Sequence, residues 1–357
     1  MTANLEIDLA AIAANWRFLD ASHPGETAAV LKADGYGLGA ARMAPVLAAA
    51  GCRTFLTAHL DEAIALRPLL PHAAIAVLNG LYPHAAADFR AHGVLPVLGS
   101  LHDIALWRAQ ARAEGQALPA WLHLETGMHR LGLAEAEIDQ LCADSSQLAG
   151  LRVDLVMTHL LAAEFPADAA NARQRALFHA LAARFPGART SLANSSGMFL
   201  GPAFQSDLAR PGAALYGVNP TPGRANPMRN VVRLLAPILQ IHEIPAGEGV
   251  GYGWLWRAER PSRIATIGVG YADGYHRILT NQGHAIFDGT PIPLVGRVSM
   301  DLTTFDVTGV PAASPGDMLC LLGPLHGVDA LAAEAGTNGY EILTSLGRRY
   351  QRHYTGA

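Results

Sequence analysis

Eight short apolar segments, distributed over the first two thirds of the chain, constrain its fold more than any other feature. Enough residues for a helix separate each pair, and Leu9, Ile12, Trp16 and Leu19 show helical spacing before the first segment. Repeated strand–helix units predict an α/β fold, a parallel (β/α)8 barrel. A doubly wound open sheet is the alternative, but no GxGxxG follows the first strand. The expected strands are Ala28–Lys32, Thr54–His59, Ala74–Asn79, Val94–Leu98, Trp121–Glu125, Leu155–His159, Thr190–Asn194 and Ala214–Val218.

A cluster of Pro, Gly and Asn at Asn219–Met228 marks the expected domain boundary. We therefore expect a barrel over residues 1–222 and a mainly antiparallel β domain over residues 223–357, because short turns replace most helices there. Its expected strands are Leu234–Ile244, Ser262–Gly268, His284–Val295, Leu302–Val307 and Asp317–Leu322, followed by helical stretches at Val328–Ala335 and Tyr340–Leu346.

Composition excludes several classes of protein. Half of the 357 residues are hydrophobic, so the chain has enough apolar surface to fold, and its net charge of −4 argues against a basic face for nucleic acid. We identify neither a secretory signal nor a membrane span, and the three distant cysteines suggest a reducing compartment. The sequence thus predicts a cytoplasmic protein without a nucleic-acid or membrane partner, and no set of metal ligands stands out.

One residue is singled out by composition. Of the 26 basic residues, Lys32 is a lysine and the other 25 are arginines. A primary amine can lose its proton and condense with a carbonyl, whereas a guanidinium stays charged. Chance survival on the surface is the alternative, but Lys32 ends the first expected strand, where barrel enzymes place chemistry.

Polar residues also follow other expected strands. Tyr36 lies in the glycine-rich run after Lys32, Arg130 follows the fifth strand, and His159 ends the sixth. The turn Asn194–Gly197 follows the seventh strand and can hold a phosphate, although an ordinary helix cap is an equal alternative, and His159 alone is more often a core histidine. Together an amine, a phosphate cradle and arginines suggest pyridoxal phosphate as the cofactor.

The chain resembles the alanine racemase family over essentially its whole length. The matching motifs are AVLKADGYGLGA, TGMHRLG, ANSS, LARPGAALYG, GVGYADGYHR, VGRVSMDLTTFDVT and TNGYEIL. The resemblance implies a pyridoxal-phosphate enzyme that interconverts L-alanine and D-alanine and provides D-alanine for peptidoglycan. It also implies a homodimer, because the partner subunit supplies one base in this family.

The resemblance assigns roles residue by residue. Lys32 would bind the cofactor covalently and act as the base for D-alanine, and Tyr271 of the other subunit would act as the base for L-alanine. His159 would assist Tyr271, Arg210 would face the pyridine nitrogen, and Arg130 and the Met300 backbone would bind the substrate carboxylate. His123 and Asp301 would support the site. The expected phosphate ligands are Tyr36, Ser195, Gly212 and Tyr340.

Three positions depart from the family pattern. His123 replaces a lysine whose carbamate orients the arginine at position 130, and we expect chloride, Glu125 or His123 itself to take over, with chloride ranked first. Ser191 and Leu38 each stand where histidine is common, which changes the surroundings of the site.

Other functions remain open from the sequence. A serine or broader amino-acid racemase of the same fold is the main alternative, because one methylene gives only about 1–3 kcal/mol of discrimination. A decarboxylase fits Arg210 poorly, a pyridoxal-phosphate carrier would not need Tyr271, and a sugar- or phosphate-binding barrel would leave Lys32 unexplained.

Overall fold

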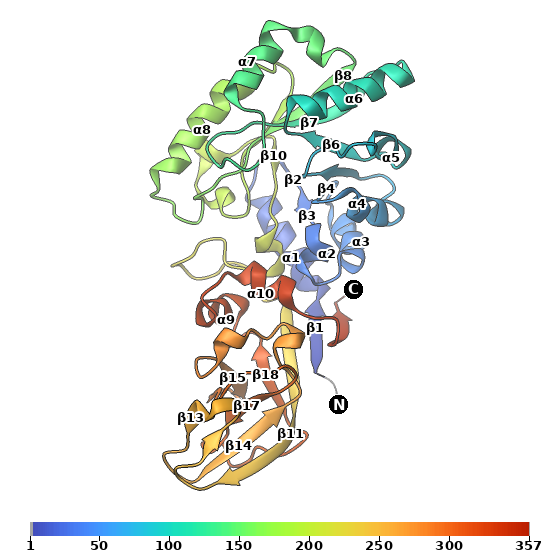
Figure 1. The fold of residues 1–357 in the computed structure, drawn as a ribbon. Helices are drawn as coiled ribbons and strands as arrows, with labels where there is room; N and C mark the ends of the chain where they lie inside the picture. Colours follow the sequence, from blue (N-terminus) through green and yellow to red (C-terminus); the bar gives the residue numbers. More distant parts are fainter. Residues whose placement is uncertain (1–2, 357) are drawn as a thin grey trace.

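The barrel expected for the first part of the chain is present in the computed structural model, which describes residues 3–356 (Figure 1). Seven parallel strands follow one another in chain order around a curled sheet. They are β3 (Ala29–Val30), β4 (Thr54–Thr57), β5 (Ala74–Val77), β6 (Leu95–Leu98), β7 (Leu118–His123), β8 (Leu151–Met157) and β9 (Arg189–Ser191).

An eighth strand closes the sheet, but it is not the expected one. β10 (Leu208–Ala209) pairs in parallel with β2 (Glu26–Thr27), which leads into β3, while Arg210 bridges to Asn194 beyond β9. The expected strand Ala214–Val218 is wrong, because Ala213–Tyr216 forms a 3-10 turn. Its apolar residues are buried since the turn packs on α1 (Leu9–Ala21), where Asn15 donates to the Leu215 carbonyl at 3.1 Å.

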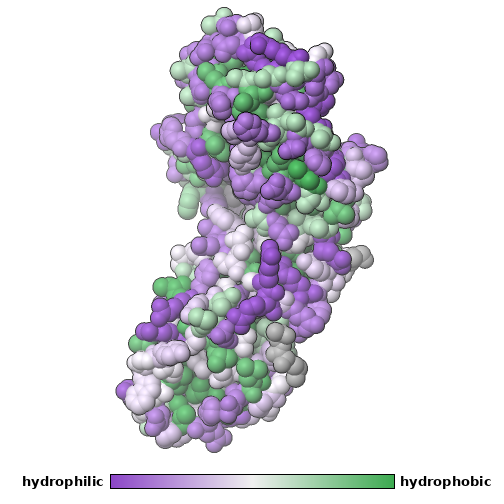
Figure 2. All heavy atoms as spheres, turned by 45° about the vertical axis from the view of Figure 1, so that its right-hand side comes forward, coloured by the Kyte–Doolittle hydropathy of each residue, from purple (hydrophilic) through white to green (hydrophobic). Residues whose placement is uncertain are grey.

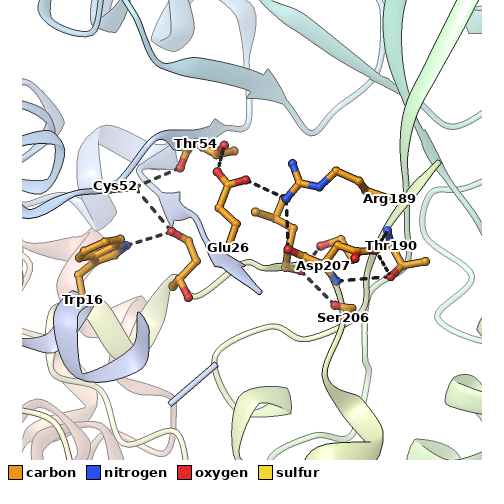
Figure 3. Close-up of polar contacts among 11 residues, drawn as sticks. Trp16, Glu26, Cys52, Thr54, Arg189, Thr190, Ser206 and Asp207 are labelled. Carbon is orange, nitrogen blue, oxygen red and sulfur yellow. Dashed lines mark hydrogen bonds and ion pairs between the residues drawn. The ribbon is translucent and has the colours of Figure 1, made fainter. Parts of the chain in front are cut away.

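Polar contacts join β2, β4, β9 and β10 near this closure (Figure 3). Arg189 donates to Glu26 at 2.8 Å, and Glu26 also accepts from the Thr54 hydroxyl. Asp207 accepts from the backbone and hydroxyl of Thr190 at 2.7 and 2.8 Å. These bonds tie the first and last strands of the barrel together.

Alternation along the strands separates two cores. Val30, Leu56, Val97 and Leu155 belong to a cluster contributed by residues in the strands or directly beside them, which fills the barrel interior. Neighbouring residues such as Phe55 point the opposite way and pack against the helices. Besides α1, these are α3 (Ala40–Ala50), α4 (Leu60–Leu66), α5 (Ala86–Ala91), α6 (Leu101–Glu114), α7 (Glu135–Ala143) and α8 (Ala169–Ala182).

The second part of the chain forms the expected mainly antiparallel sheet. Its order is β16-β15-β18-β11-β1-β19, with β14 paired to β11 and β17 paired to β14. The single strand expected over His284–Val295 is instead a hairpin of β15 (His284–Phe287) and β16 (Thr290–Pro293), because the chain turns at Asp288 and Gly289, which both have positive φ. The other strands are β1 (Asn4–Asp8), β11 (Val232–Ile244), β14 (Ser262–Ile267), β17 (Thr303–Asp306), β18 (Met318–Leu322) and β19 (Gln351–Thr355), and β12 (Gly249–Val250) pairs separately with β13 (Trp256–Arg257).

Both ends of the described chain join this sheet. β1 lies between β11 and β19, parallel to β19 and antiparallel to β11, so the first strand belongs with the second domain. The sequence predicts a barrel over residues 1–222, and β1 departs from this prediction. So short a segment gives no sign that it pairs with β11 and β19. The division of the chain at residue 222 stays a prediction.

Two helices of the second domain reach the barrel. α9 (Val328–Glu334) packs on α10 (Gly339–Ser345), and α10 contacts α2 (Lys32–Tyr36) beside the mouth of the barrel. Arg352 in β19 donates to the Gly37 carbonyl at 2.6 Å, and Tyr354 donates to the Leu38 carbonyl at 3.0 Å. The two domains of one chain therefore meet at the segment that follows Lys32.

The molecule is elongated, and its surface combines hydrophilic and hydrophobic side chains. Figure 2 shows hydrophilic and hydrophobic side chains interspersed over both lobes on the face in view. No helix among residues 3–356 is both long and apolar enough to cross a bilayer.

Candidate active site

A cavity of about 660 Å³ lies where the carboxyl ends of the barrel strands meet α10. Most of the expected site residues line it, although they come from segments far apart in the sequence. They are Lys32, Tyr36, Arg130, His159, Ser195, Arg210, Gly212 and Tyr340. Four expected residues do not line it: His123, Tyr271, Met300 and Asp301.

Lys32 follows β3 and is the first residue of α2. Burial lowers the pKa of its amine, the charge of Arg130 lowers it further, and Glu62 opposes this shift. Glu62 is itself fixed, because it accepts from the backbone of Ala33 at 2.6 Å and of Ala58 at 2.8 Å. A lowered pKa increases the unprotonated fraction of the amine, which is the form that attacks a carbonyl.

The turn after Lys32 has an uncommon backbone conformation. Ala33, Asp34 and Tyr36 have φ of 53°, 53° and 55°, and Gly35 between them has φ 63°. Left-handed helical geometry costs an L-residue roughly 1–2 kcal/mol. Asp34 offsets part of this cost, since its carbonyl and side chain accept from the backbone of Gly39 and Ala40 at 2.8 and 2.9 Å. Three residues of the turn that are not glycine thus have positive φ. The glycine-rich sequence does not predict this, because positive φ is expected at its glycines.

This conformation directs Tyr36 toward Gly212, the residue before the 3-10 turn at Ala213–Tyr216. The Tyr36 ring stacks on Tyr216 with 4.5 Å between centroids, and Tyr216 donates to the Val30 carbonyl at 2.7 Å. A Cβ on residue 212 would collide with the Tyr36 hydroxyl, so only glycine fits there. Burial raises the pKa of Tyr36, and the Tyr36 hydroxyl remains a neutral donor toward the cavity.

The Asn194–Gly197 turn serves two purposes. Asn194 accepts from the Gly197 backbone at 2.9 Å, which is the capping role weighed for this turn. Ser195 instead faces the barrel, where its oxygen accepts from the backbone of Gly212 at 2.9 Å and Ala214 at 3.2 Å. The Ser195 hydroxyl hydrogen is then left to donate into the cavity. Ser195, Tyr36 and Tyr340 thus offer hydroxyl groups at one end of it.

Arg210 is a buried cation held by neutral groups. It donates to the carbonyls of Ser191, at 2.9 Å, and Thr158, and to the Ser191 hydroxyl. Ser191, a departure from the family pattern, supports this arginine through its own oxygen. Burial lowers the pKa of Arg210 to about 10, so it stays protonated at neutral pH. None of the ion pairs within residues 3–356 includes Arg210.

Two histidines near Arg210 are held neutral. Burial, followed by the charge of Arg210, lowers the pKa of His159 to about 3 and that of His123 to about 4. His159 therefore acts as a hydrogen-bonding group and not as a cation. His123 is buried behind the cavity wall and contributes no charge to balance Arg130.

Arg130 is exposed in the single chain, so its guanidinium is not buried there. Glu125, one candidate to steady it, is already engaged with the backbone of Gly127 and, at 2.8 Å, of His129. Across the described part of the chain, no carboxylate forms an ion pair with Arg130. Arg130 is thus free to meet an anion that enters the cavity.

Tyr271, Met300 and Asp301 lie together on the surface of the second domain. Tyr271 donates from its backbone to the Ser299 carbonyl at 3.0 Å, and Ala272 donates to the Met300 carbonyl at 2.9 Å. Tyr271 is 42% exposed and Met300 is 54% exposed. Arg349 joins both segments, since it contacts Asp273 at 3.0 Å and Asp301 at 2.7 Å.

Several supporting residues were missed from the sequence. Gln174 in α8 is buried and donates to the His159 carbonyl at 2.9 Å and to Thr126 at 3.1 Å, and Thr126 bonds the Thr158 hydroxyl at 2.7 Å. This network holds Thr158 and His159, the two residues that follow β8. The available signal in the sequence was the position of Gln174 on the buried face of α8. Helical periodicity alone does not distinguish this buried glutamine from exposed ones.

The depressed pKa values of His123 and His159 make a testable prediction. Both rings should stay neutral at pH 5.5 in the folded protein, whereas the unfolded chain protonates its histidines as pH falls through about 6.5. The free energy of unfolding should therefore decrease from about pH 6.5 toward pH 4. Nitrogen-15 NMR of labelled histidines, assigned with His123→Gln and His159→Gln, measures this directly; midpoints near 6.5 would contradict the electrostatics described above.

Comparisons with known proteins agree with this architecture. Family models described as "Alanine racemase, N-terminal domain" and "Alanine racemase, C-terminal domain" match residues 7–220 and 231–354. The alanine racemase of Acidiphilium cryptum is 62% identical over 98% of this chain and 97% of its own, and that of Methylobacterium nodulans is 51% identical over 99% and 96%.

A solved structure is similarly close in shape. The alanine racemase from Bartonella henselae, described with covalently bound pyridoxal phosphate, has a TM-score of 0.96 and 40% identity, covering 99% of each chain. With both domains matched and relatives similar along the whole sequence, this chain belongs to the alanine racemase family.

Proposed function

We propose that this protein is a pyridoxal-phosphate-dependent racemase that interconverts L-alanine and D-alanine. The observation that carries the proposal is the position of Lys32, the one lysine of the chain, whose pKa is lowered in a cavity with hydroxyl donors on one side and Arg210 on another. Membership of the alanine racemase family and the coenzyme in the Bartonella henselae relative support the same conclusion. We infer a role in supplying D-alanine for peptidoglycan, and a cytoplasmic location.

The residues of the cavity fit the coenzyme. Lys32 would bind its aldehyde, Ser195, Tyr36 and Tyr340 would donate to its phosphate beside Gly212, and Arg210 would face its ring nitrogen. When bound, the coenzyme withdraws electrons from the substrate and acidifies the Cα–H bond. Its phosphate would also bring negative charge into a cavity whose cations Lys32, Arg130 and Arg210 form no ion pair within residues 3–356.

Arg210 limits the electron withdrawal. A guanidinium donates hydrogen bonds and accepts none, and with a pKa of about 10 it keeps its proton at neutral pH. Arg210 would therefore donate to the ring nitrogen of the coenzyme and would keep that nitrogen without a proton. This favours return of the proton to the substrate carbon over competing reactions such as transamination.

Racemisation requires proton transfer on two opposite faces of the substrate carbon. Two fixed bases achieve this without a large motion of either one. We assign Lys32 to the proton of D-alanine and Tyr271 to the proton of L-alanine. An ordinary phenol is a weak base at neutral pH, so neutral His159, backed by Arg210, would hydrogen-bond the Tyr271 oxygen.

Tyr271 must reach this cavity from a second copy of the chain. In the single chain it lies outside the cavity lining, and the same domain also exposes Tyr252, Trp254, Leu255, Ile278 and Leu302. Exposed apolar side chains in this number are typical of an interface. We therefore propose a homodimer in which residues 1–222 bind the coenzyme and residues 223–357 supply Tyr271 to the partner, with Asp301 holding the Met300 segment through Arg349.

The substrate carboxylate needs a cationic receptor. Arg130 lines the cavity and makes no ion pair with the described carboxylates, so we assign it to that carboxylate together with the Met300 backbone of the partner subunit. Because an imidazole such as His123 supplies no negative charge, and Glu125 is engaged with backbone N–H groups, we place a chloride ion beside Arg130 once the partner subunit and substrate cover it.

The first test concerns the coenzyme linkage and the substrate. Borohydride reduction of the purified protein should attach the coenzyme irreversibly to the peptide that contains Lys32, and L-alanine should lose optical activity faster than L-serine or larger amino acids. A colourless protein, label on another peptide, or a faster reaction with L-serine would each overturn the assignment.

The second test separates the two bases. Tyr271→Phe removes the base for L-alanine and should lower racemisation by about 10²–10⁴-fold. In deuterium oxide the variant should still exchange the Cα hydrogen of D-alanine through Lys32 but not that of L-alanine. Proton NMR of both enantiomers follows the exchange, with Tyr82→Phe, an exposed tyrosine of the barrel outside the cavity lining, as the control. Equal loss of exchange from both enantiomers would refute the assignment of faces.

A further inference from the structure

Three side chains outside the cavity converge in the second domain. His284 begins β15, His326 lies in the turn between β18 and α9, and Glu334 is the last residue of α9. The Nδ1 atom of His284 lies 2.6 Å from Oε1 of Glu334, and Nε2 of His326 lies 3.2 Å from the same oxygen. One nitrogen or oxygen atom from each residue lies within 4.8 Å of the others.

The polar groups of this cluster are incompletely satisfied by the described residues. His326 is 1% exposed, yet neither of its ring nitrogens makes a hydrogen bond, because the contact with Glu334 is not aligned for one. The second carboxylate oxygen of Glu334 is also buried without a partner. Buried nitrogen and oxygen atoms are almost always paired, so a cluster with unpaired atoms on both His326 and Glu334 calls for a ligand.

We propose that His284, His326 and Glu334 bind one divalent transition-metal ion of the zinc type. Imidazole nitrogen and carboxylate oxygen are zinc ligands, with bond lengths of about 2.0–2.2 Å. Tetrahedral geometry at that length separates ligand atoms by about 3.3 Å, close to the 3.2 Å between His326 and Glu334. Three protein ligands leave the fourth position to water.

The arrangement also allows the ion to enter. The rings of His284 and His326 stack with 3.9 Å between centroids and so reach Glu334 side by side. The side chain of His284 is 31% exposed and that of Glu334 is 19% exposed, which opens a path from solvent. Binding requires the Nδ1 atom of His284 and the Oε1 atom of Glu334, which lie 2.6 Å apart, to separate to metal-ligand spacing.

The metal would act on the structure of the second domain. It would link β15 and the His326 turn to the end of α9, whose first turn accepts from the Asn219 backbone through Asp329 at 3.0 Å. Asn219 lines the cavity. The ion would thus stabilise a helix that contacts the active site while taking no part in the chemistry there.

Metal analysis of the intact enzyme tests this proposal. Untagged protein carrying its coenzyme is treated with a chelator, loaded with zinc chloride and desalted, after which mass spectrometry should find about one zinc ion per chain. Glu334→Gln and His284→Gln, which keep side-chain size or polarity, should each weaken zinc at least about tenfold in competition with a coloured chelator. His242→Gln, an exposed histidine in β11, should leave the affinity unchanged.

A cobalt-loaded sample gives a readout that does not depend on the variants folding. Cobalt bound as proposed should show the visible absorption of a four-coordinate ion in the unmodified protein, and the melting temperature should rise with added zinc. Much less than one zinc per chain in the unmodified protein would overturn the proposal. Zinc retained equally in Glu334→Gln and His284→Gln would also overturn it, and would leave the cluster as polar contacts within the domain.

Discussion

The concentration of positive charge at the mouth of the barrel governs the rest of the site. Lys32, Arg130 and Arg210 line one cavity, and the two arginines make no ion pair within residues 3–356. This charge and burial keep His123 and His159 neutral and lower the pKa of Lys32. An anionic coenzyme and the carboxylate of an amino-acid substrate are the natural complements of such a cavity, because each supplies negative charge to cations that have no ion-pair partner in the protein.

The strained turn after Lys32 shows why the site depends on the whole fold. Ala33, Asp34 and Tyr36 adopt left-handed conformations that the isolated segment would avoid. They persist since Glu62 holds the backbone of Ala33 from one side, and Arg352 of the second domain holds Gly37 from the other. The antiparallel domain therefore shapes the coenzyme pocket of its own chain, besides the tyrosine that we propose it gives to its partner.

Much of this was predictable from the sequence, and the failures have physical causes. Apolar runs placed the strands from β3 to β9 correctly, and the family motifs located eight cavity residues, although their proposed roles await experiment. Ala214–Val218 misled because burial in a 3-10 turn and in a strand require the same apolar residues. Exposure of Arg130 and the positive φ of Ala33 were not predictable, since both depend on tertiary packing and neither leaves a mark on local periodicity.

The central claim, an active site made from Lys32 of one chain and Tyr271 of another, is tested most directly by subunit complementation. Lys32→Ala and Tyr271→Phe homodimers should each be inactive, but random mixing forms hybrid dimers in which one of the two sites has both intact residues. Activity should then recover to about a quarter of the unmodified value. No recovery from mixed dimers of proven composition would contradict the account, and would place both residues in sites of the same chain.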